Sequence, residues 1–228
     1  MEILVTNDDG VDAPGILALE KLARELGNVW VFAPSGCRSG CSHRVTTESP
    51  LKMSELRPGV KTIDGTPADC VRLALHCLGK KFDWVFAGIN SGGNLGVDIH
   101  LSGTVAAVRE AAIHEIPGIA FSQYRRRGRD FDWDRSLHLA RQAMASVMKE
   151  PWQKGFFWNV NLPHLDQEIP DPPLVCCHPN PGPLPLEFHV REDRFHYAGD
   201  YHARAREPGS DVDVCFRGKV ALSRLGIF

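Results

Sequence analysis

The chain has 228 residues, of which 43% are apolar and 24% charged, so it is long enough to bury a substantial core. A formal net charge of -2 argues against general affinity for nucleic acid or an anionic membrane surface. No run of about 18 apolar residues occurs, and the chain enters a strand without a basic, apolar leader. Seven irregularly spaced cysteines favour free thiols. These features predict a soluble cytoplasmic protein.

Buried apolar runs alternate with helical periodicity through the first part of the chain. The predicted strands lie at 3–5, 29–34, 83–90 and 118–123. The predicted helices lie at 15–26, 66–78, 102–112 and 134–149. This alternation predicts an α/β fold whose sheet is mostly parallel and doubly wound, with helices on both faces.

The regular alternation stops near residue 163, where proline-rich segments follow. The tail at 194–225 alternates apolar and polar residues in several places, which predicts strands or a hairpin. We therefore expect an α/β catalytic core at 1–163 and, within the same structural domain, a proline-rich segment and hairpin extension at 164–228. An extended hairpin often packs against a second subunit, so we expect a homo-oligomer.

Polar side chains follow three of the predicted strands. Asp8 and Asp9 end the first strand, Ser39 lies in the loop after the second, and Asn90 ends the strand at 83–90. A doubly wound sheet brings such positions to one edge, where ligands bind. Adjacent carboxylates repel, and oxygen donors suit Mg2+ or Mn2+ better than zinc. The alternative is an ordinary surface turn, in which Asp and Gly are common.

A second group of residues resembles an anion cradle. Gly92 and Gly93 permit close backbone approach, and the helix start at Ser102, Gly103 and Thr104 offers hydroxyls and free amides that suit a phosphate. Such a triplet also commonly serves only as a helix cap. Combined with a metal site, it predicts metal-assisted phosphoester hydrolysis.

Three neighbouring features keep two interpretations each. His43 is a candidate to protonate the leaving alkoxide, or it bonds within its own loop. Asn7 orients the acids or contacts phosphate, or it holds the turn. The arginine run at 124–129 attracts a polyanionic substrate, or it is a solvated loop balanced by nearby aspartates.

Other function classes fit less well. A signalling receiver domain needs a lysine that closes the fifth strand, where this chain has Ser122 and Gln123. A haloacid-dehalogenase-type phosphatase needs an aspartate at Asn7. A non-catalytic nucleotide- or phosphate-binding regulatory module remains the alternative, although neither GxxxxGK[ST] nor a properly placed GxGxxG is present.

The chain also resembles the survival protein E (SurE) family of metal-dependent 5'-nucleotidases. The matching motifs are ILVTNDDG with APGI, APS with SGCSH, DGTPADCVRLAL, AGIN with GGNLG, SGTVAA and IPGIA, all within residues 3–120. NVNLP at 159–163 and GSDVDV at 209–214 match more weakly. The resemblance implies a Rossmann-like core, a protruding carboxyl-terminal hairpin, dimers or tetramers, and nucleoside monophosphate phosphatase activity of the acid phosphomonoesterase type. The choice between 5'- and 3'-phosphates and activity on polyphosphate stay open at this point.

Carried over position by position, the family's metal ligands fall on the same four residues, Asp8, Asp9, Ser39 and Asn90, and one divalent cation per subunit is expected. The family's phosphate-contacting hydroxyls fall on Ser102 and Thr104. This chain departs from the pattern at Asp12, where many relatives have a histidine, and in the loop that contains Cys37 and Cys41.

Overall fold

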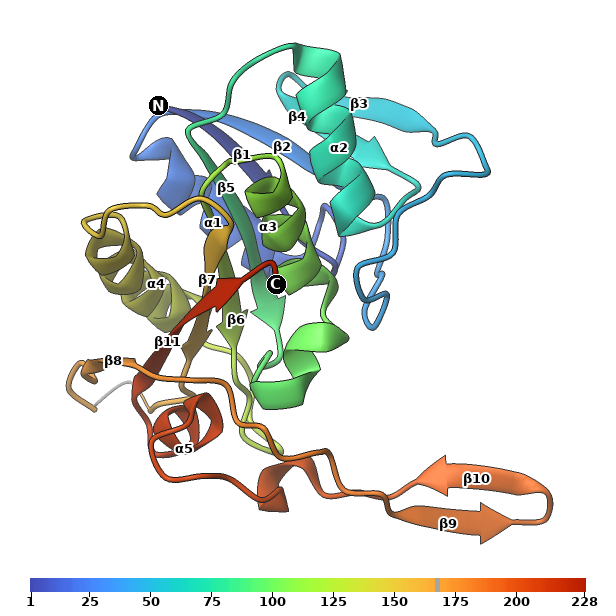
Figure 1. Ribbon diagram of the computed structural model, residues 1–228, viewed down its shortest axis with the longest axis vertical. Helices are drawn as coiled ribbons and strands as arrows, with labels where there is room; N and C mark the ends of the chain where they lie inside the picture. Colours follow the sequence, from blue (N-terminus) through green and yellow to red (C-terminus); the bar gives the residue numbers. More distant parts are fainter. Residues whose placement is uncertain (167–168) are drawn as a thin grey trace.

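The computed structural model describes residues 1–166 and 169–228 and has the predicted α/β architecture (Figure 1). One nine-stranded sheet has the order β3-β4-β2-β1-β5-β6-β7-β11-β8. Its strands are β1 (Glu2–Thr6), β2 (Asn28–Pro34), β3 (Met53–Arg57), β4 (Val60–Ile63), β5 (Trp84–Ser91), β6 (Gly118–Gln123), β7 (Phe156–Leu162), β8 (Leu174–Cys176) and β11 (Val220–Gly226). The six neighbouring strands β4, β2, β1, β5, β6 and β7 are mutually parallel. Strand β3 runs antiparallel to β4, and β11 runs antiparallel to β7.

Helices cover both faces of this sheet, as the alternation predicted (Figure 1). One face packs on α1 (Pro14–Arg24) and α4 (Trp133–Val147), and the other packs on α2 (Pro67–Leu78) and α3 (Gly103–Ile113). Within β1, Ile3 and Val5 enter the first of these cores and Leu4 the second. An unbroken apolar run is therefore required, because a central strand is buried on both faces.

Helix starts follow the local chemistry expected from the sequence. Thr66 and Asp69 form a capping box at the start of α2, with Pro67 in the first turn. Gly15 allows α1 to approach β5 closely, since a Cβ there would lie 1.9 Å from the carbonyl oxygen of Ile89. That contact holds β5 at Ile89, the residue before Asn90.

The tail differs in part from its prediction. The hairpin exists, as β9 (Phe188–Arg191) and β10 (Arg194–Tyr197), and it projects from the body (Figure 1). Residues 211–216 are wrongly predicted as extended, because they form the helix α5 (Asp211–Phe216). Ser210 caps this helix by accepting a hydrogen bond from the amide of Asp213, and such a cap outweighs the alternating pattern of DVDV.

The tail also completes the main sheet, because β11 inserts between β7 and β8. Sequence analysis did not identify the β3–β4 hairpin at the opposite edge. The part of the proline-rich stretch at 167–168 lies outside the described residues. Within the described part, no helix combines the length and apolarity required to span a bilayer.

Candidate active site

The Asp8 carboxylate is buried at the junction between the end of β1 and the beginning of α3. The hydroxyl of Thr104 donates to Asp8 Oδ1, and the side chain of Asp8 is almost fully covered. Burial raises the pKa of Asp8 above its ordinary range, the bonds from Thr104 oppose that rise, and the neighbouring charge of Asp9 adds to it. Burial therefore disfavours the charged form of Asp8, and a bound cation would stabilise that form.

Asp9 connects β1 to the end of β5. Its Oδ2 accepts a hydrogen bond of 2.9 Å from the backbone amide of Ser91. Next to Ser91, the Asn90 amide nitrogen donates to the carbonyl of Gly92 at 2.8 Å, which leaves the Asn90 side-chain oxygen as an acceptor. The structure thus brings Asp8, Asp9 and Asn90 to one edge of the sheet.

The loop after β2 lies against the same edge. The backbone amide of Arg38, the residue before Ser39, donates to the Asp8 carbonyl at 2.7 Å. Ser39 is exposed, and its hydroxyl lies 3.1 Å from Cys37 Sγ. Metal binding through the Ser39 hydroxyl remains a prediction.

Asn7 and the glycine loop shape the backbone around these groups. The side-chain nitrogen Nδ2 of Asn7 donates to the Gly10 carbonyl at 2.7 Å. The buried Oδ1 of Asn7 has no hydrogen-bond partner among the described residues. Gly92 adopts a φ of +149°, which side-chain-bearing residues rarely adopt, so the turn after β5 requires glycine. The next residue, Gly93, packs closely on its surroundings, since a Cβ there would lie 3.2 Å from the Leu95 side chain and 3.6 Å from Asn161 Oδ1.

The start of α3 lies directly against Asp8. The Ser102 hydroxyl caps the helix by accepting from the amide of Val105 at 3.0 Å. Gly103 is the first helical residue, and a Cβ there would lie 2.9 Å from Asp8 Cβ. Because Ser102 caps the helix and Thr104 bonds Asp8, both hydroxyls already have partners in this structure, and phosphate contact through them remains a prediction.

His43 lies in the loop after β2 and contacts Glu110 on α3. Its Nε2 lies 2.8 Å from Glu110 Oε2, and Glu110 is also bound by Arg72 at 2.9 Å and by His114 at 3.1 Å. Burial raises the pKa of Glu110, but the bonds from His43 and Arg72 outweigh it and lower that pKa to about 2. The bond fixes one imidazole nitrogen of His43, and a role in proton transfer remains a prediction.

We expect Glu110→Gln to destabilise the fold at neutral pH by about 1–3 kcal/mol, because the variant loses a buried carboxylate with cationic partners. The folded-state pKa of Glu110 lies below its ordinary value of 4.5, so its stabilisation is present above pH 4.5 and is lost as the pH falls toward 2. Urea unfolding at pH 7 and pH 3 measures this difference. Glu115→Gln removes an exposed carboxylate nearby and should have little effect at either pH.

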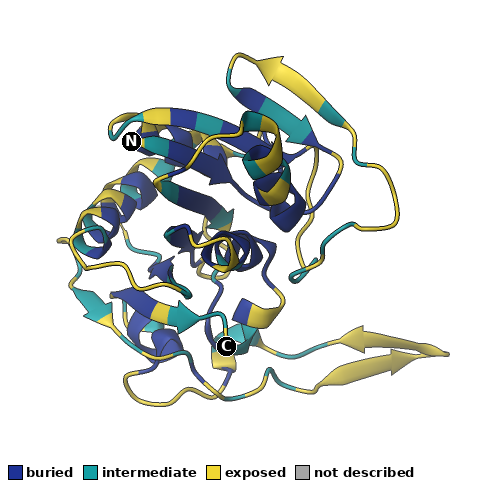
Figure 2. Ribbon diagram, turned by 45° about the horizontal axis from the view of Figure 1, so that its top comes forward, coloured by how far each residue is buried: buried dark blue, intermediate teal, exposed yellow. Residues whose placement is uncertain are grey.

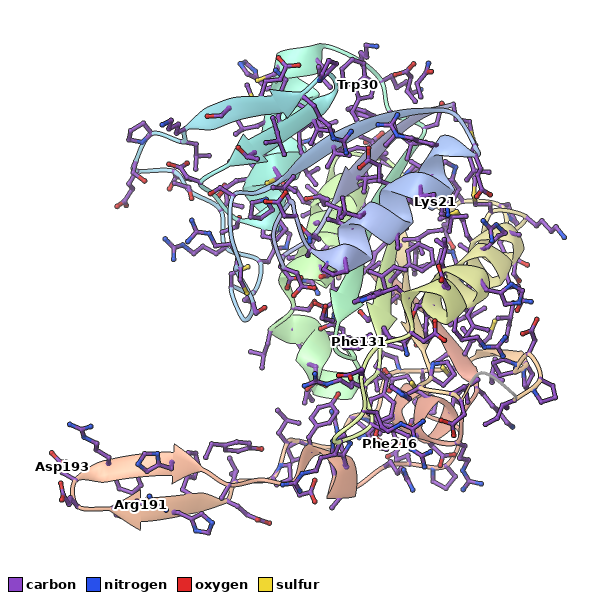
Figure 3. All side chains as sticks on the ribbon, turned by 180° about the vertical axis from the view of Figure 1, so that it is seen from behind. Lys21, Trp30, Phe131, Arg191, Asp193 and Phe216 are labelled. Atoms are coloured by element: carbon purple, nitrogen blue, oxygen red, sulfur yellow. The ribbon has the colours of Figure 1, made fainter. Side chains whose placement is uncertain are left out.

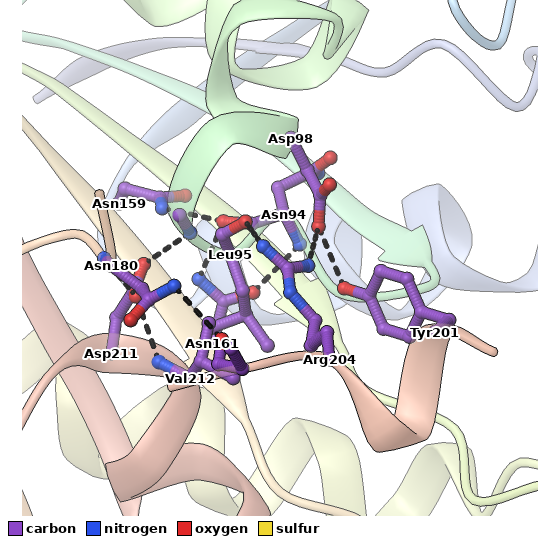
Figure 4. A network of polar contacts seen from close by, with 12 residues as sticks. Asn94, Leu95, Asp98, Asn159, Asn161, Asn180, Tyr201, Arg204, Asp211 and Val212 are labelled. Carbon is purple, nitrogen blue, oxygen red and sulfur yellow. Dashed lines mark hydrogen bonds and ion pairs between the residues drawn. The ribbon is translucent and has the colours of Figure 1, made fainter. Parts of the chain in front are cut away.

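A buried polar network holds the segment between the glycine loop and α3 (Figure 4). Asn161 on β7 accepts from the amide of Asn94 at 2.8 Å, and Asn159 donates to the Asn94 carbonyl at 2.9 Å. Asp211 at the start of α5 accepts from the amide of Gly96 at 2.7 Å. Residues 94–96 are therefore fixed by β7 and by the tail together.

The segment that follows the hairpin joins this network through Arg204. The Arg204 guanidinium is fully buried and bonds Asp98 Oδ2 at 2.8 Å and the Leu95 carbonyl at 3.2 Å (Figure 4). Tyr201 donates its hydroxyl proton to the same Asp98 oxygen at 2.7 Å. The base of the hairpin is thus anchored to the loop that leads into α3.

The edge of the sheet that carries Asp8, Asp9 and Asn90 is called the acidic edge. A cavity of about 390 Å³ opens beside it, with Ser91 in its wall. Its walls come from three separated parts of the chain: the glycine loop (residues 91–93), the arginine loop after β6 (residues 124–129) and the base of the hairpin (residues 201–202). The lining residues are Ser91, Gly92, Gly93, Tyr124, Arg125, Arg127, Gly128, Tyr201 and His202. The cavity combines the aromatic side chains of Tyr124 and Tyr201 with the charges of Arg125 and Arg127, so it suits a planar ring attached to an anion.

Comparison with known proteins assigns this arrangement to a family. The family model described as survival protein SurE matches residues 3–176. This chain belongs to the SurE family. A solved SurE protein from Aquifex aeolicus superposes with a TM-score of 0.86 at 32% identity, covering 100% of this chain and 94% of that one.

Curated SurE relatives match over nearly the whole chain. The 5'-nucleotidase SurE of Geobacter sulfurreducens is 36% identical and covers 99% of this chain and 87% of its own length. The 5'-nucleotidase candidate alr3139 of Nostoc sp. is 47% identical, covering 100% of both chains. The SurE resemblance drawn from the motifs is therefore confirmed.

Sequence reasoning missed several residues that line or support this candidate site. Tyr201 and His202 line the cavity but lie far along the chain from the acids, in a segment without a motif. Asn161 had a weak signal, since NVNLP belongs to the recognised pattern. Glu110 also had one, as a carboxylate in the apolar helix that follows SGT.

Proposed function

We propose that this chain is a divalent-metal-dependent phosphatase that hydrolyses nucleoside 5'-monophosphates to nucleoside and phosphate. The observation that carries the proposal is the buried Asp8 carboxylate, which lies beside Asp9 and against the first turn of α3. A helix start attracts phosphate, and a paired acid attracts a cation. The names of the curated relatives support the 5'-nucleotide as substrate.

The donor atoms present fit a hard cation. Carboxylate oxygens of Asp8 and Asp9, the Asn90 amide oxygen and the Ser39 hydroxyl are the types that Mg2+ and Mn2+ prefer. The unpartnered Asn7 Oδ1 adds a further buried oxygen next to Asp8. When bound, the ion would polarise the phosphoryl group and activate water.

The remaining groups would orient the nucleotide. The amides at the start of α3 would hold the phosphate, with Gly92 and Gly93 allowing the backbone to approach it. Tyr124 and Tyr201 offer ring faces for the base. His43, whose Nε2 is held by Glu110, would donate a proton to the leaving alkoxide through its other nitrogen. Seven unpaired thiols support a reducing cytoplasmic location.

Phosphate release from chelator-stripped protein tests the proposal. The panel comprises 5'- and 3'-monophosphates of several nucleosides and short polyphosphate, each with Mg2+ or Mn2+ added separately. We expect turnover of 5'-monophosphates only when a divalent ion is added. Binding of AMP without release of phosphate under every condition would instead support a non-catalytic nucleotide-binding module.

The hairpin is proposed to join subunits into a dimer or tetramer. Both of its strands are exposed along their length, and Arg191 and Asp193 mark its tip away from the body (Figures 2 and 3). The register pairs Phe195 with Val190 and Tyr197 with Phe188 on one apolar face. A patch of this kind, held away from the core, is typical of an interface between proteins.

We expect the protein to sediment as a dimer or larger species at micromolar concentration, and Phe188→Ser with Phe195→Ser to shift it to a smaller one. The two substitutions replace two of the four apolar side chains on this face without touching the core. His189→Ser with His196→Ser alters the opposite face of the same hairpin and should leave the assembly unchanged. Sedimentation velocity measures all three proteins, and a monomeric wild type would contradict the assignment.

A further inference from the structure

A second and larger cavity, of about 530 Å³, adjoins the cavity beside the acidic edge. The two share Tyr124, Arg127 and His202 in their walls. The larger one lies between the arginine loop after β6 and α5, so the tail forms its far side. A ligand that fills the first cavity can therefore extend into the second.

The walls of the second cavity are strongly cationic. Its lining includes Arg126, Arg127, Arg206 and Arg217 together with His164, and no Asp or Glu of the described residues lines it. These groups come from three parts of the chain, namely the loop after β6, the segment after β7 and the region around α5. Folding thus concentrates positive charge that is scattered along the sequence.

Among the described residues, most of this charge lacks an ion-pair partner. Neither Arg126 nor Arg127 forms an ion pair with a carboxylate of residues 1–166 or 169–228. Arg206 and Arg217 share the single carboxylate of Asp213, at 4.0 and 2.7 Å. Four guanidinium groups are therefore balanced by one described carboxylate, which leaves capacity for a dianion.

His164 and the aromatic wall add independent evidence. The Nδ1 of His164 is buried without a hydrogen-bond partner in the described structure. Burial lowers the pKa of His164, and the charges of Arg129, Arg126 and Arg125 lower it further, so the potential there is positive. Beside it, Tyr124 stacks on the Phe216 ring at 4.6 Å between centroids, which makes one wall flat and apolar.

We propose that the second cavity binds a second phosphate group of the substrate, and that the favoured substrate class is the nucleoside 3',5'-bisphosphate. This inference rests on the proposed function, which places the nucleoside in the first cavity and the scissile phosphate at the acidic edge. The ribose 3'-phosphate then extends past Tyr124 toward Arg126 and Arg206. A monophosphate leaves these arginines unused.

Direct binding to metal-free protein tests the proposal without turnover. In calorimetric titrations with chelator, adenosine 3',5'-bisphosphate should bind about tenfold or more tightly than AMP, since bonds to charged groups contribute that much. Arg126→Gln with Arg206→Gln should reduce bisphosphate affinity to that of AMP and leave AMP affinity within about twofold. Arg129→Gln, in the same loop but paired with Asp166, should change neither.

Three outcomes would overturn the inference. The first is equal affinity of the wild type for the two nucleotides, and the second is an equal loss of bisphosphate affinity in the double variant and the Arg129 control. The third is binding of inorganic phosphate that depends on Arg126 and Arg206 without any bisphosphate preference, which would make the cavity a free-phosphate site. Absence of AMP hydrolysis with metal would overturn the proposed function instead, because the binding preference is measured without catalysis.

Discussion

Replacing Asp8 with asparagine is expected to lower kcat/KM for AMP by about a thousandfold or more while leaving the fold intact. The substitution removes one negative charge from the acidic edge but almost no volume. Asparagine retains a side-chain oxygen that can accept the hydrogen bond from the Thr104 hydroxyl. Because burial already raises the pKa of Asp8, loss of this charge should not destabilise the metal-free protein.

Two measurements separate metal binding from folding in this variant. Thermal unfolding without metal should give nearly the same Tm for wild type and Asp8→Asn, whereas added Mn2+ should raise the Tm of the wild type but not that of Asp8→Asn. Asp12→Asn neutralises an exposed carboxylate in the same loop and should keep both activity and the Mn2+ response. Turnover retained by Asp8→Asn would remove Asp8 from the mechanism.

Gly103→Ala is expected to lower kcat/KM by about a hundredfold through a steric effect alone. Alanine favours helices over glycine, so the backbone of α3 accepts it. Its methyl group, however, would lie 2.8 Å from Cys41 Sγ and 2.9 Å from Asp8 Cβ, closer than atoms pack. Asp8 or the helix start must shift, and a displacement of about 1 Å at a catalytic group costs roughly this factor.

Gly36→Ala provides the matched control for this substitution. Gly36 lies in the loop after β2, and a Cβ there meets no atom within 4 Å. Steady-state kinetics of AMP hydrolysis should show a large loss for Gly103→Ala and almost none for Gly36→Ala. Equal activity of the two variants would mean that the contact between Asp8 and the start of α3 does not govern the reaction.

The meeting of Asp8 and Asn90 at one edge of the sheet could be predicted, because the carboxyl ends of parallel strands lie on the same side. Asp8 and Asn90 each follow an apolar run, and chain order alone places such residues on one side of a doubly wound sheet. Local chemistry likewise identified the α2 cap at Thr66 and the α3 cap at Ser102. These features depend on neighbouring residues, so a short stretch of sequence carries their full signal.

The walls of the two cavities could not be predicted in this way. Tyr124 and His202 form a hydrogen bond although 78 residues separate them in the chain. Their meeting depends on the path of the tail, which leaves the body as a hairpin, returns at Arg204 and inserts β11 beside β7. DVDV also adopts a helix because Ser210 caps it, which the alternating pattern concealed.

The α/β class, the order of the core elements, the SurE family and the oxygen-rich edge of the sheet could all be predicted from the sequence, since periodicity and strand-end motifs are local properties. Only the folded chain shows which side chains line the two cavities, which hydroxyls already have hydrogen-bond partners, and where arginines gather. The physical reason is that burial, charge balance and cavity shape arise from contacts between distant segments. No short window of sequence contains both partners of such a contact.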